Sequence, residues 1–348
     1  MRFENVEIAS IGYDLAPIKT SSEEIEERLG KLYQRLALPK GRLALMTGIT
    51  DRRFYDLDER PSRAASRAAV SALTRANIDI ADVDCIINGS VCRDFLEPAT
   101  ATEVAKLLGA DESTLLYDIS NACLGVLNGM LAIANMIELS QIDTGIVVAG
   151  ELGESLVNAT IDSLNNDPNL TRKTLKPSIA SLTIGSGAVA LLLTRKELCN
   201  NGHKLLGYSF KSAVGGNDLC SSINDVGFSS AAAPLMNTDS EKLLIEGCKL
   251  ASSTWAQFLK NLNWTKDDVK HIFTHQVGSI YRKTLYEYLE MPIEKDYETV
   301  SFLGNIGSVS APITLAIGAD KRIIEKGENV ALLGIGSGLN SLMFGIEW

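Results

Sequence analysis

The chain has 348 residues, of which 45% are hydrophobic and 22% are charged, proportions that are typical of a soluble globular protein. A chain of this length holds one large α/β domain or two fused halves, each with its own core. The formal net charge of -10 argues against unspecific contact with nucleic acid or an anionic membrane. A local basic groove for a phosphate-bearing ligand is still compatible with that charge.

The cysteines indicate a reduced protein. None of the six forms a CxxC pair or stands at metal-ligand spacing from a histidine, so no zinc site is expected. We expect no other metal and no cofactor. The N-terminus does not resemble a signal peptide, and the longest apolar stretch, 124–139, is too short to span a bilayer. We therefore expect a cytoplasmic protein with free thiols. The six are Cys85, Cys92, Cys123, Cys199, Cys220 and Cys248.

Apolar periodicity and turn residues divide the first half of the chain into strands and helices. Strands that alternate with helices indicate an α/β fold with a largely parallel sheet. Strands are expected at 6–11, 85–88, 115–119, 145–149 and 188–193, and helices at 22–36, 61–76, 99–108 and 124–138.

The second half repeats this plan, which predicts an N-terminal half at 1–195 and a C-terminal half at 196–348. The segment 194–238 has no clear periodicity, so we expect it to join the halves and to supply loops at a substrate entrance. A polar surface loop is expected at 165–176. Helices are predicted at 240–262, 279–289 and 311–325, and strands at 269–273, 330–333 and 341–348.

Two features of the first half recur in the second half at nearly the same separation in the sequence. The sequence Ile-Gly-Ser-Gly occurs at 184–187 and again at 335–338, 151 residues later. Cys123 and His275, each at a junction from strand to helix, lie 152 residues apart. This agreement predicts a duplicated fold in which Cys123 and His275 occupy equivalent strand ends and face each other.

Cys123 is the candidate nucleophile. It stands where a short strand ends and a helix starts, so its thiol would meet unpaired N–H groups and the positive end of the helix dipole. Such a site favours the thiolate, which is the reactive form. The alternative is a buried cysteine that only fills space.

His275 and Asn305 are the candidate partners of Cys123. His203 lies in a turn and His271 at the start of a strand, whereas His275 ends an apolar strand, where open α/β sheets place ligands. Asn305 lies between glycines just before a helix, and its amide could donate a hydrogen bond to an oxyanion. The alternative for this segment is a simple turn.

Together these motifs resemble the Cys-His-Asn set of thiolase-fold condensing enzymes, and in particular β-ketoacyl-ACP synthase III. The resemblance covers essentially the whole chain. It implies two pseudo-symmetric βα halves packed as an αβαβα sandwich, a homodimer, and substrate contacts from Arg52 and Arg53. The motifs are Asn121-Ala122-Cys123, His275-Gln276, Gly304-Asn305-Ile306-Gly307, Thr47-Gly48-Ile49 with Arg52-Arg53, and Gly336-Ser337-Gly338.

Within this superfamily the chain is similar to the OleA-type head-to-head condensing thiolases of long-chain olefin biosynthesis. The similar segments are 90–100, 243–247 and 334–340. In OleA-type enzymes a glutamate before a proline enters the active site of the partner subunit as a base. Glu97 matches it, 26 residues before Cys123. Without the resemblance, Glu97 would be an exposed loop carboxylate.

The resemblance implies a Claisen condensation of two acyl thioesters. Cys123 would carry the first acyl group, with the oxyanion held by its own N–H and by one from Gly336-Ser337-Gly338. His275 and Asn305 would hold the second thioester, and Glu97 of the partner subunit would remove its α-proton. The expected substrates are fatty acyl-CoAs, with acyl carrier protein as an alternative carrier, and the product a 2-alkyl-3-oxoacyl thioester.

Four alternatives remain open at this point. A decarboxylative synthase III would use acyl-CoA and malonyl-ACP and would need no Glu97. A thioesterase-like enzyme would hydrolyse the acyl-enzyme. A non-catalytic subunit of a condensing heterodimer is disfavoured because Cys123, His275 and Asn305 are all present. A binding protein with an α/β fold would have an unreactive Cys123.

Overall fold

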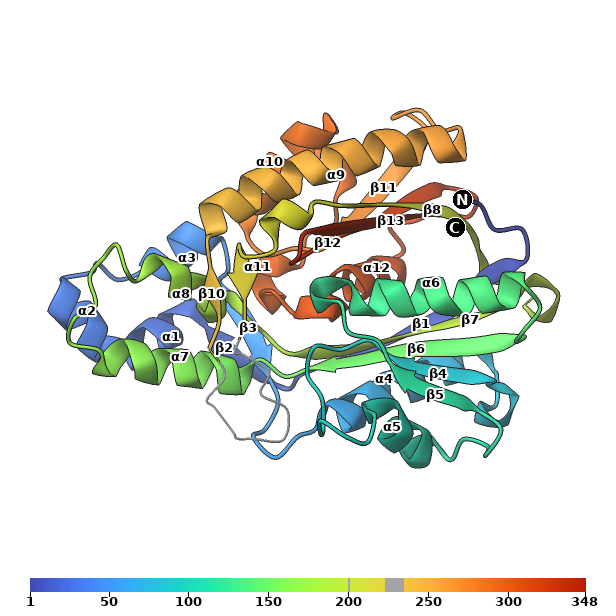
Figure 1. Cartoon of the computed structure of the whole chain (residues 1–348), viewed down its shortest axis with the longest axis horizontal. Coiled ribbons are helices and arrows are strands. Elements are labelled where there is room, and N and C mark those ends of the chain that lie inside the picture. Colours follow the sequence, from blue (N-terminus) through green and yellow to red (C-terminus); the bar gives the residue numbers. More distant parts are fainter. Residues whose placement is uncertain (200, 223–234) are drawn as a thin grey trace.

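The computed structural model describes residues 1–199, 201–222 and 235–348, and it contains a nine-stranded mixed sheet (Figure 1). Only three of its eight strand pairs are parallel: β11–β12, β6–β4 and β4–β5. The expectation of a largely parallel sheet is therefore wrong, because each half closes with a strand that returns antiparallel. In sheet order the strands are β11 (Val269–Thr274), β12 (Asn329–Gly336), β13 (Asn340–Glu347), β8 (His203–Ser212), β1 (Val6–Leu15), β7 (Gly187–Arg195), β6 (Thr144–Glu151), β4 (Cys85–Asn88) and β5 (Leu115–Asp118).

The sheet divides into two layers because β1 and β8 pair through only two residue pairs, Glu7 with Lys204 and Ile8 with His203. Two helices lie between the layers, and two further pairs cover the outer faces (Figure 1). This arrangement confirms the αβαβα sandwich. The inner helices are α6 (Gly125–Glu138) and α12 (Ser310–Asp320); the outer pairs are α4 (Pro61–Ala76) with α5 (Thr100–Leu108), and α9 (Ser240–Leu262) with α10 (Ser279–Leu289).

Helix α12 is buried on all sides because a sheet layer covers each of its faces, whereas α6 exposes Asn135. Every residue of α12 from Ser310 to Gly318 is buried. Such a helix cannot be amphipathic in the usual way, since no side of it meets water. In contrast, the outer helix α4 buries an alanine-rich face, and this lets it approach β1 closely: a Cβ at Gly12 would lie 2.2 Å from the carbonyl oxygen of Ala68.

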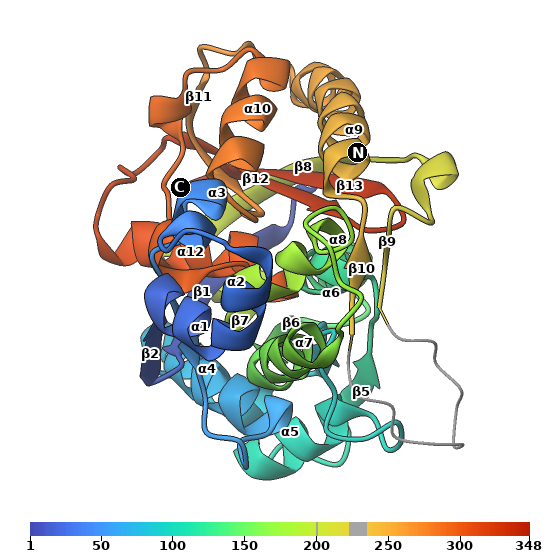
Figure 2. The same cartoon turned by 90° about the vertical axis from the view of Figure 1, so that its left-hand side faces the viewer.

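A cap of short helices lies at one end of the sandwich, where Figures 1 and 2 both show them together. The expected helix 22–36 is broken at Leu29, and its start has the capping box of Ser21 and Glu24. The polar loop expected at 165–176 follows a helix that the sequence did not indicate. The cap contains α1 (Ser22–Arg28), α2 (Gly30–Leu36), α3 (Arg42–Thr47), α7 (Glu154–Asn166) and α8 (Lys176–Ile179); the remaining elements are α11 (Val300–Leu303), β2 (Ile18–Ser21), β3 (Asp51–Phe54), β9 (Cys220–Ser221) and β10 (Asn237–Thr238).

The two halves repeat one order of elements, but in a different register from the one expected. Helices α6 and α12 begin at residues 125 and 310, which are 185 apart, and β6 and β12 begin at 144 and 329, also 185 apart. The final strands β7 and β13 begin at 187 and 340, only 153 apart, because the first half inserts α7 and α8 before β7.

The equivalence of Cys123 and His275 is therefore wrong. Cys123 lies just before α6, so its counterpart lies just before α12, whereas His275 follows β11, whose counterpart is β4. The separation of 152 residues is close only to the offset of 153 residues between the final strands β7 and β13. The segment 194–238, which showed no periodicity, contains β8 at the junction of the two layers; its part at 223–234, expected to contribute entrance loops, lies outside the described residues.

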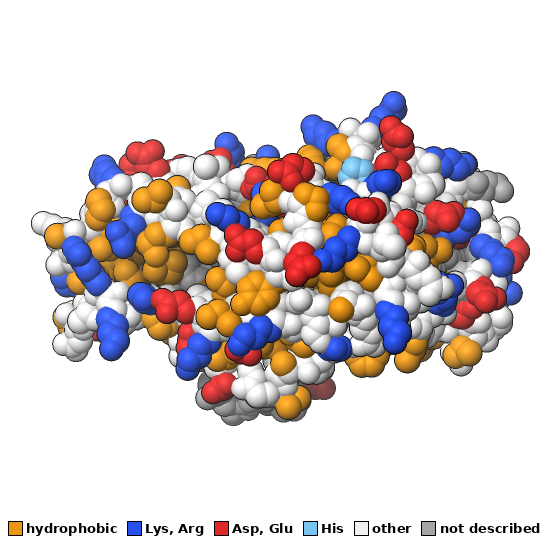
Figure 3. Space-filling view, turned by 90° about the horizontal axis from the view of Figure 1, so that it is seen from above, with side chains coloured by type: hydrophobic (Ala, Val, Ile, Leu, Met, Phe, Trp, Pro, Cys, Tyr) orange, Lys and Arg blue, Asp and Glu red, His pale blue; other side chains and the backbone are white. Residues whose placement is uncertain are grey.

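The surface carries charges of both signs. Figure 3, which looks down on the α9–α10 side, shows basic and acidic side chains intermingled with apolar ones. The net charge of -10 is therefore not gathered as a single acidic field on this face. Over the described part of the chain, no helix has the length and apolarity that crossing a membrane requires.

Candidate active site

Cys123 lies at the centre of a 3₁₀ turn, Ala122–Leu124, that leads into α6. The residue before it, Ala122, has φ +44°, in the left-handed region that non-glycine residues rarely adopt. The turn packs against β12, where a Cβ at Gly336 would lie 3.6 Å from the backbone nitrogen of Cys123. A Cβ at Gly334 would lie 2.4 Å from a Leu124 methyl carbon. The glycines of β12 thus allow the Cys123 turn to approach the sheet.

The thiol of Cys123 is protonated in the free chain. Burial raises its pKa to about 12, and the nearby Glu151 and Cys220 act in the same direction. The expectation that the helix start favours the thiolate is therefore wrong for the free chain, because loss of hydration outweighs it.

His275 follows β11 and is nearly inaccessible, with 6% of its surface exposed. Its backbone N–H donates to the carbonyl oxygen of Leu333 on β12 at 2.9 Å. Burial lowers the pKa of the imidazole to about 4, so the ring is neutral at physiological pH. Its Nδ1 atom is buried without a hydrogen-bond partner among the described residues. A neutral ring with an unused nitrogen is suited to bind a ligand oxygen.

Asn305 lies in a turn that the backbone fixes on both sides. Its N–H donates to the carbonyl oxygen of Thr183 at 2.9 Å, and its own carbonyl accepts from the N–H of Gly185 at 2.9 Å. Gly304 has φ +69°, and a Cβ there would lie 2.6 Å from the Thr183 oxygen, so the turn requires glycine. The side-chain Oδ1 accepts from the N–H of Gly307 at 3.1 Å, which leaves the Nδ2 group free to donate within the described structure.

The segments that carry Cys123, His275 and Asn305 meet at one end of the sandwich. The Cys123 turn packs against both β12 and the turn Gly307–Val309, which begins two residues after Asn305. His275 is bonded to β12, and the N–H of Gln276 donates to the hydroxyl of Ser310 at 3.1 Å. The structure thus joins three segments that are far apart in the sequence.

Gly336 ends β12, and Ser337 and Gly338 lie in the turn to β13, beside the Cys123 segment. The side-chain amide of Asn340 donates to Asn121 at 3.3 Å and to the Ser337 carbonyl at 3.5 Å. This amide links the predicted oxyanion loop to the residues that precede Cys123.

Glu97 is not part of this cluster within one chain. It lies on the loop after β4, with an exposed side chain, and it makes no hydrogen bond or ion pair with Cys123, His275 or Asn305 in the described structure. The same loop exposes three large apolar side chains. They are Val91, Phe95 and Leu96, at 52%, 47% and 47% exposure.

Arg52 and Arg53 contact the chain itself. The Arg52 side chain is completely buried, donates to the Ser22 hydroxyl at 3.0 Å, and has its pKa lowered to about 10 by burial. Arg53 donates to the carbonyl oxygen of Ala16 at 3.0 Å. Substrate binding by these two arginines stays a prediction.

Glu151, at the end of β6, is a polar residue of this region that the sequence did not single out. Its side chain is buried, with 5% of the surface exposed, and it lies close enough to influence the Cys123 thiol. A single carboxylate at the end of an apolar strand gives no local pattern by which to recognise it.

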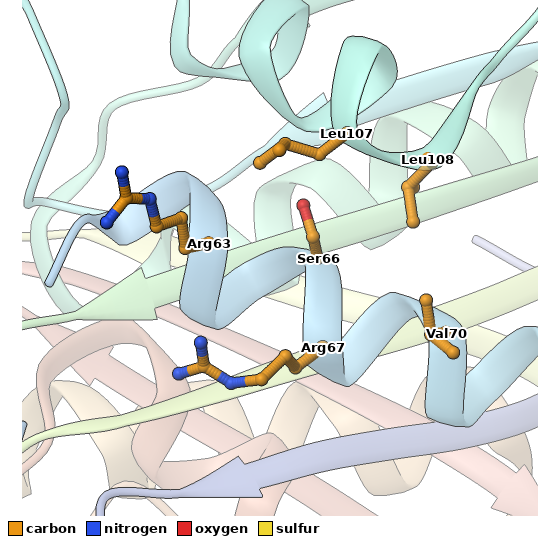
Figure 4. Close-up of a pocket in the computed structure, with 6 residues that line it drawn as sticks. All are labelled: Arg63, Ser66, Arg67, Val70, Leu107 and Leu108. Carbon is orange, nitrogen blue, oxygen red and sulfur yellow. The ribbon is translucent and has the colours of Figure 1, made fainter.

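A separate pocket of about 460 Å³ lies on the surface between α4 and α5. Figure 4 shows Arg63, Ser66, Arg67 and Val70 on one helix and Leu107 and Leu108 on the other, with Ser66 pointing toward the second helix. These helices cover the face of the sheet opposite to α6, so the sheet separates this pocket from Cys123. Among the described residues, no group of three or more His, Cys, Asp or Glu side chains is placed to hold a metal.

Comparison with known proteins agrees with this geometry. Residues 44–179 match the N-terminal domain of thiolase, and residues 259–348 match the C-terminal domain of 3-oxoacyl-[acyl-carrier-protein] synthase III. An acyl-CoA:acyl-CoA alkyltransferase of Shewanella oneidensis is 44% identical, with all of both chains covered. The chain belongs to this alkyltransferase family. The homologous alkyltransferase of Xanthomonas campestris is 36% identical, again over the full length of both chains.

More distant relatives and solved structures place the family within the thiolase fold. A β-ketoacyl-ACP synthase III of Clostridioides difficile is 27% identical over 88% of this chain and 89% of its own. Cerulenin-bound OleA from Xanthomonas campestris has a TM-score of 0.94 at 36% identity, covering 100% of this chain and 98% of that one. A Cys-to-Ser variant of the same OleA, with bound lauric acid and lauroyl-CoA, has a TM-score of 0.93 and covers 99% and 100%.

Proposed function

We propose that this alkyltransferase-family chain joins two fatty acyl-CoAs by a non-decarboxylative Claisen condensation, forming a 2-alkyl-3-oxoacyl-CoA. The observation that carries the proposal is the meeting of the Cys123, His275 and Asn305 segments at the end of β12. A half-buried thiol, a neutral imidazole and a free amide donor fit acyl transfer followed by enolate stabilisation.

In the first step the sulfur of Cys123 attacks the carbonyl carbon of one acyl-CoA. The N–H of Cys123 and one from Gly336-Ser337-Gly338 hold the oxyanion of the tetrahedral intermediate. Collapse of the intermediate breaks the bond to the CoA sulfur. The proton of the Cys123 thiol ends on the departing CoA, which leaves acyl-Cys123 and free CoA.

In the second step the carbonyl oxygen of another acyl-CoA accepts hydrogen bonds from His275 and Asn305, which stabilise its enolate. Glu97 of the partner subunit removes the α-proton. The resulting carbanion attacks the carbonyl of acyl-Cys123 and displaces the sulfur of Cys123. The proton held on Glu97 returns to that sulfur, so both residues are restored and only the condensed thioester is released.

We further propose that the enzyme is a cytoplasmic homodimer. The apolar side chains around Glu97, exposed to water in a single chain, suit contact with a second copy. Burial of this loop would bring Glu97 to the partner's site. We also propose to divide the chain at 195/196, since β7 ends at Arg195 and β8 begins at His203.

The test is intact-mass spectrometry of the protein after incubation with acyl-CoAs of graded chain length, with analysis of the products. We expect one acyl group on Cys123 and a 2-alkyl-3-oxoacyl product without release of CO2. A Cys199→Ser variant, altered at a half-buried thiol outside this cluster, should behave like the wild type. Condensation that requires malonyl-ACP and releases CO2 would favour a synthase III, and free fatty acid as the sole product would favour a thioesterase.

A further inference from the structure

Glu151 accepts hydrogen bonds from two segments that meet at the site. Its Oε1 accepts from the N–H of Val91 at 2.9 Å and from the N–H and hydroxyl of Ser308 at 3.3 and 2.5 Å. Its Oε2 accepts from the N–H of Cys92 at 3.2 Å. A Cβ at Gly307 would lie 3.2 Å from this carboxylate, so the Ser308 turn packs directly on it.

These two segments carry the groups to which the proposed function assigns the condensation step. Val91 and Cys92 open the loop on which Glu97 lies, and Ser308 stands three residues after Asn305. Val91 is 60 residues from Glu151 in the sequence, and Ser308 is 157 residues away. One buried side chain therefore sets the Glu97 loop and the Asn305 turn relative to each other.

The position of this carboxylate is unfavourable for the nucleophile. Its charge raises the pKa of the Cys123 thiol, and burial raises the pKa of Glu151 itself. Burying a carboxylate is expensive unless hydrogen bonds satisfy it, and an apolar residue would avoid both penalties. Assistance to Cys123 therefore does not explain Glu151, whereas its four hydrogen bonds to two loops do.

We propose that Glu151 is a positioning residue for the condensation step, which holds the Glu97 loop and the Asn305 turn at their working separation. The proposal rests on the proposed function. Since that function sends Glu97 into the partner's site, each Glu151 positions Asn305 in its own site and the base in the other. The acylation of Cys123 uses neither group, so Glu151 should affect it only weakly, through its charge.

The test compares Glu151→Ala and Glu151→Gln in two separate measurements, acylation of Cys123 by intact mass and turnover to the condensed product. We expect Glu151→Ala to leave acylation within about threefold of the wild type and to lower condensation roughly 10²-fold, since small displacements of reacting groups have effects of that size. The glutamine keeps an oxygen for Val91 and Ser308, so it should recover most of the condensation.

A third measurement reports the effect of the Glu151 charge on the Cys123 thiol. Both substitutions remove a negative group near Cys123, so the pH at which Cys123 reacts half-maximally with iodoacetamide should fall in each. Glu138→Gln is the matched control, because Glu138 also accepts backbone N–H groups, from Glu4 and Asn5, at the far end of α6. It should change none of the three measurements.

Several results would overturn the proposal. They are full condensation by Glu151→Ala, equal losses of acylation and condensation, or a glutamine variant as inactive as the alanine. Should Glu151→Ala not fold, Ser308→Ala replaces it and should lower condensation about tenfold with acylation retained; unchanged condensation there would contradict the proposal. A wild-type protein that does not acylate Cys123 would instead refute the proposed function.

Discussion

The starts of α6 and α12 occupy equivalent places in the two halves, and both are 3₁₀ turns, Ala122–Leu124 and Gly307–Val309. The central residue of the first is Cys123 and that of the second is Ser308. Cys123 has a side chain that the buried surroundings keep protonated. The hydroxyl of Ser308, in contrast, is engaged by the Glu151 carboxylate.

The ends of β4 and β11 form a second equivalent pair. His275 follows β11 directly and is buried, whereas β4 is followed by a loop that carries Glu97 out to the surface. In the first pair Ser308 is held by a hydrogen bond, whereas Cys123 has a free thiol. In the second pair the Nδ1 atom of His275 has no partner among the described residues, whereas the loop with Glu97 turns outward. Duplication therefore supplied the positions, and the hydrogen bonds around each position decide which chemistry it can perform.

The largest expected effect on activity comes from replacing Cys123, the reactive member of the first pair. Cys123→Ala should abolish the acyl-enzyme and lower condensation by more than about 10³-fold, because no other group at this turn can form the thioester. Ser308→Ala removes the equivalent side chain and should leave acylation intact. Intact-mass spectrometry of both variants with lauroyl-CoA checks this contrast. An acyl adduct that persists in Cys123→Ala would place the nucleophile elsewhere.

The second pair is tested by Glu97→Ala, which should lower condensation roughly 10²-fold while Cys123 is still acylated, since general-base catalysis contributes about that much. Activity in trans can be tested directly by mixing this variant with Cys123→Ala. A mixed dimer has one site with an intact Cys123 and an intact Glu97 from the other subunit, so condensation should reappear. Two inactive variants that remain inactive together would argue that Glu97 acts within its own chain.

The sequence predicted the helices with clear periodicity and the three segments that meet at the site. Helices α4, α9 and α10 have the predicted bounds because each has one continuous buried face. The direction of the strands was not predictable in the same way. Periodicity shows that a strand is buried but not which neighbour it pairs with, so the antiparallel returns of β7 and β13 were missed.

Two features of the site depend on contacts that no local pattern records. Glu151 acquires its partners only when Val91 and Ser308, 60 and 157 residues away, fold against it. The pKa of Cys123 likewise depends on loss of hydration and on that carboxylate, whereas the sequence showed only a helix start. The offset of 152 residues between Cys123 and His275 was a coincidence of the inserted helices.

The smallest expected effect concerns stability and follows from the burial of His275. Its pKa is lowered from 6.5 to about 4 in the folded chain, so between these values the unfolded chain binds the extra proton. The free energy of unfolding should therefore fall as the pH drops from about 6.5 towards 4, by up to about 3 kcal/mol from this residue. His275→Gln cannot titrate and should show a flatter dependence in urea unfolding between pH 7 and 5. Equal slopes for the variant and the wild type would mean that the folded chain binds this proton as readily as the unfolded chain, so that burial does not lower the pKa of His275.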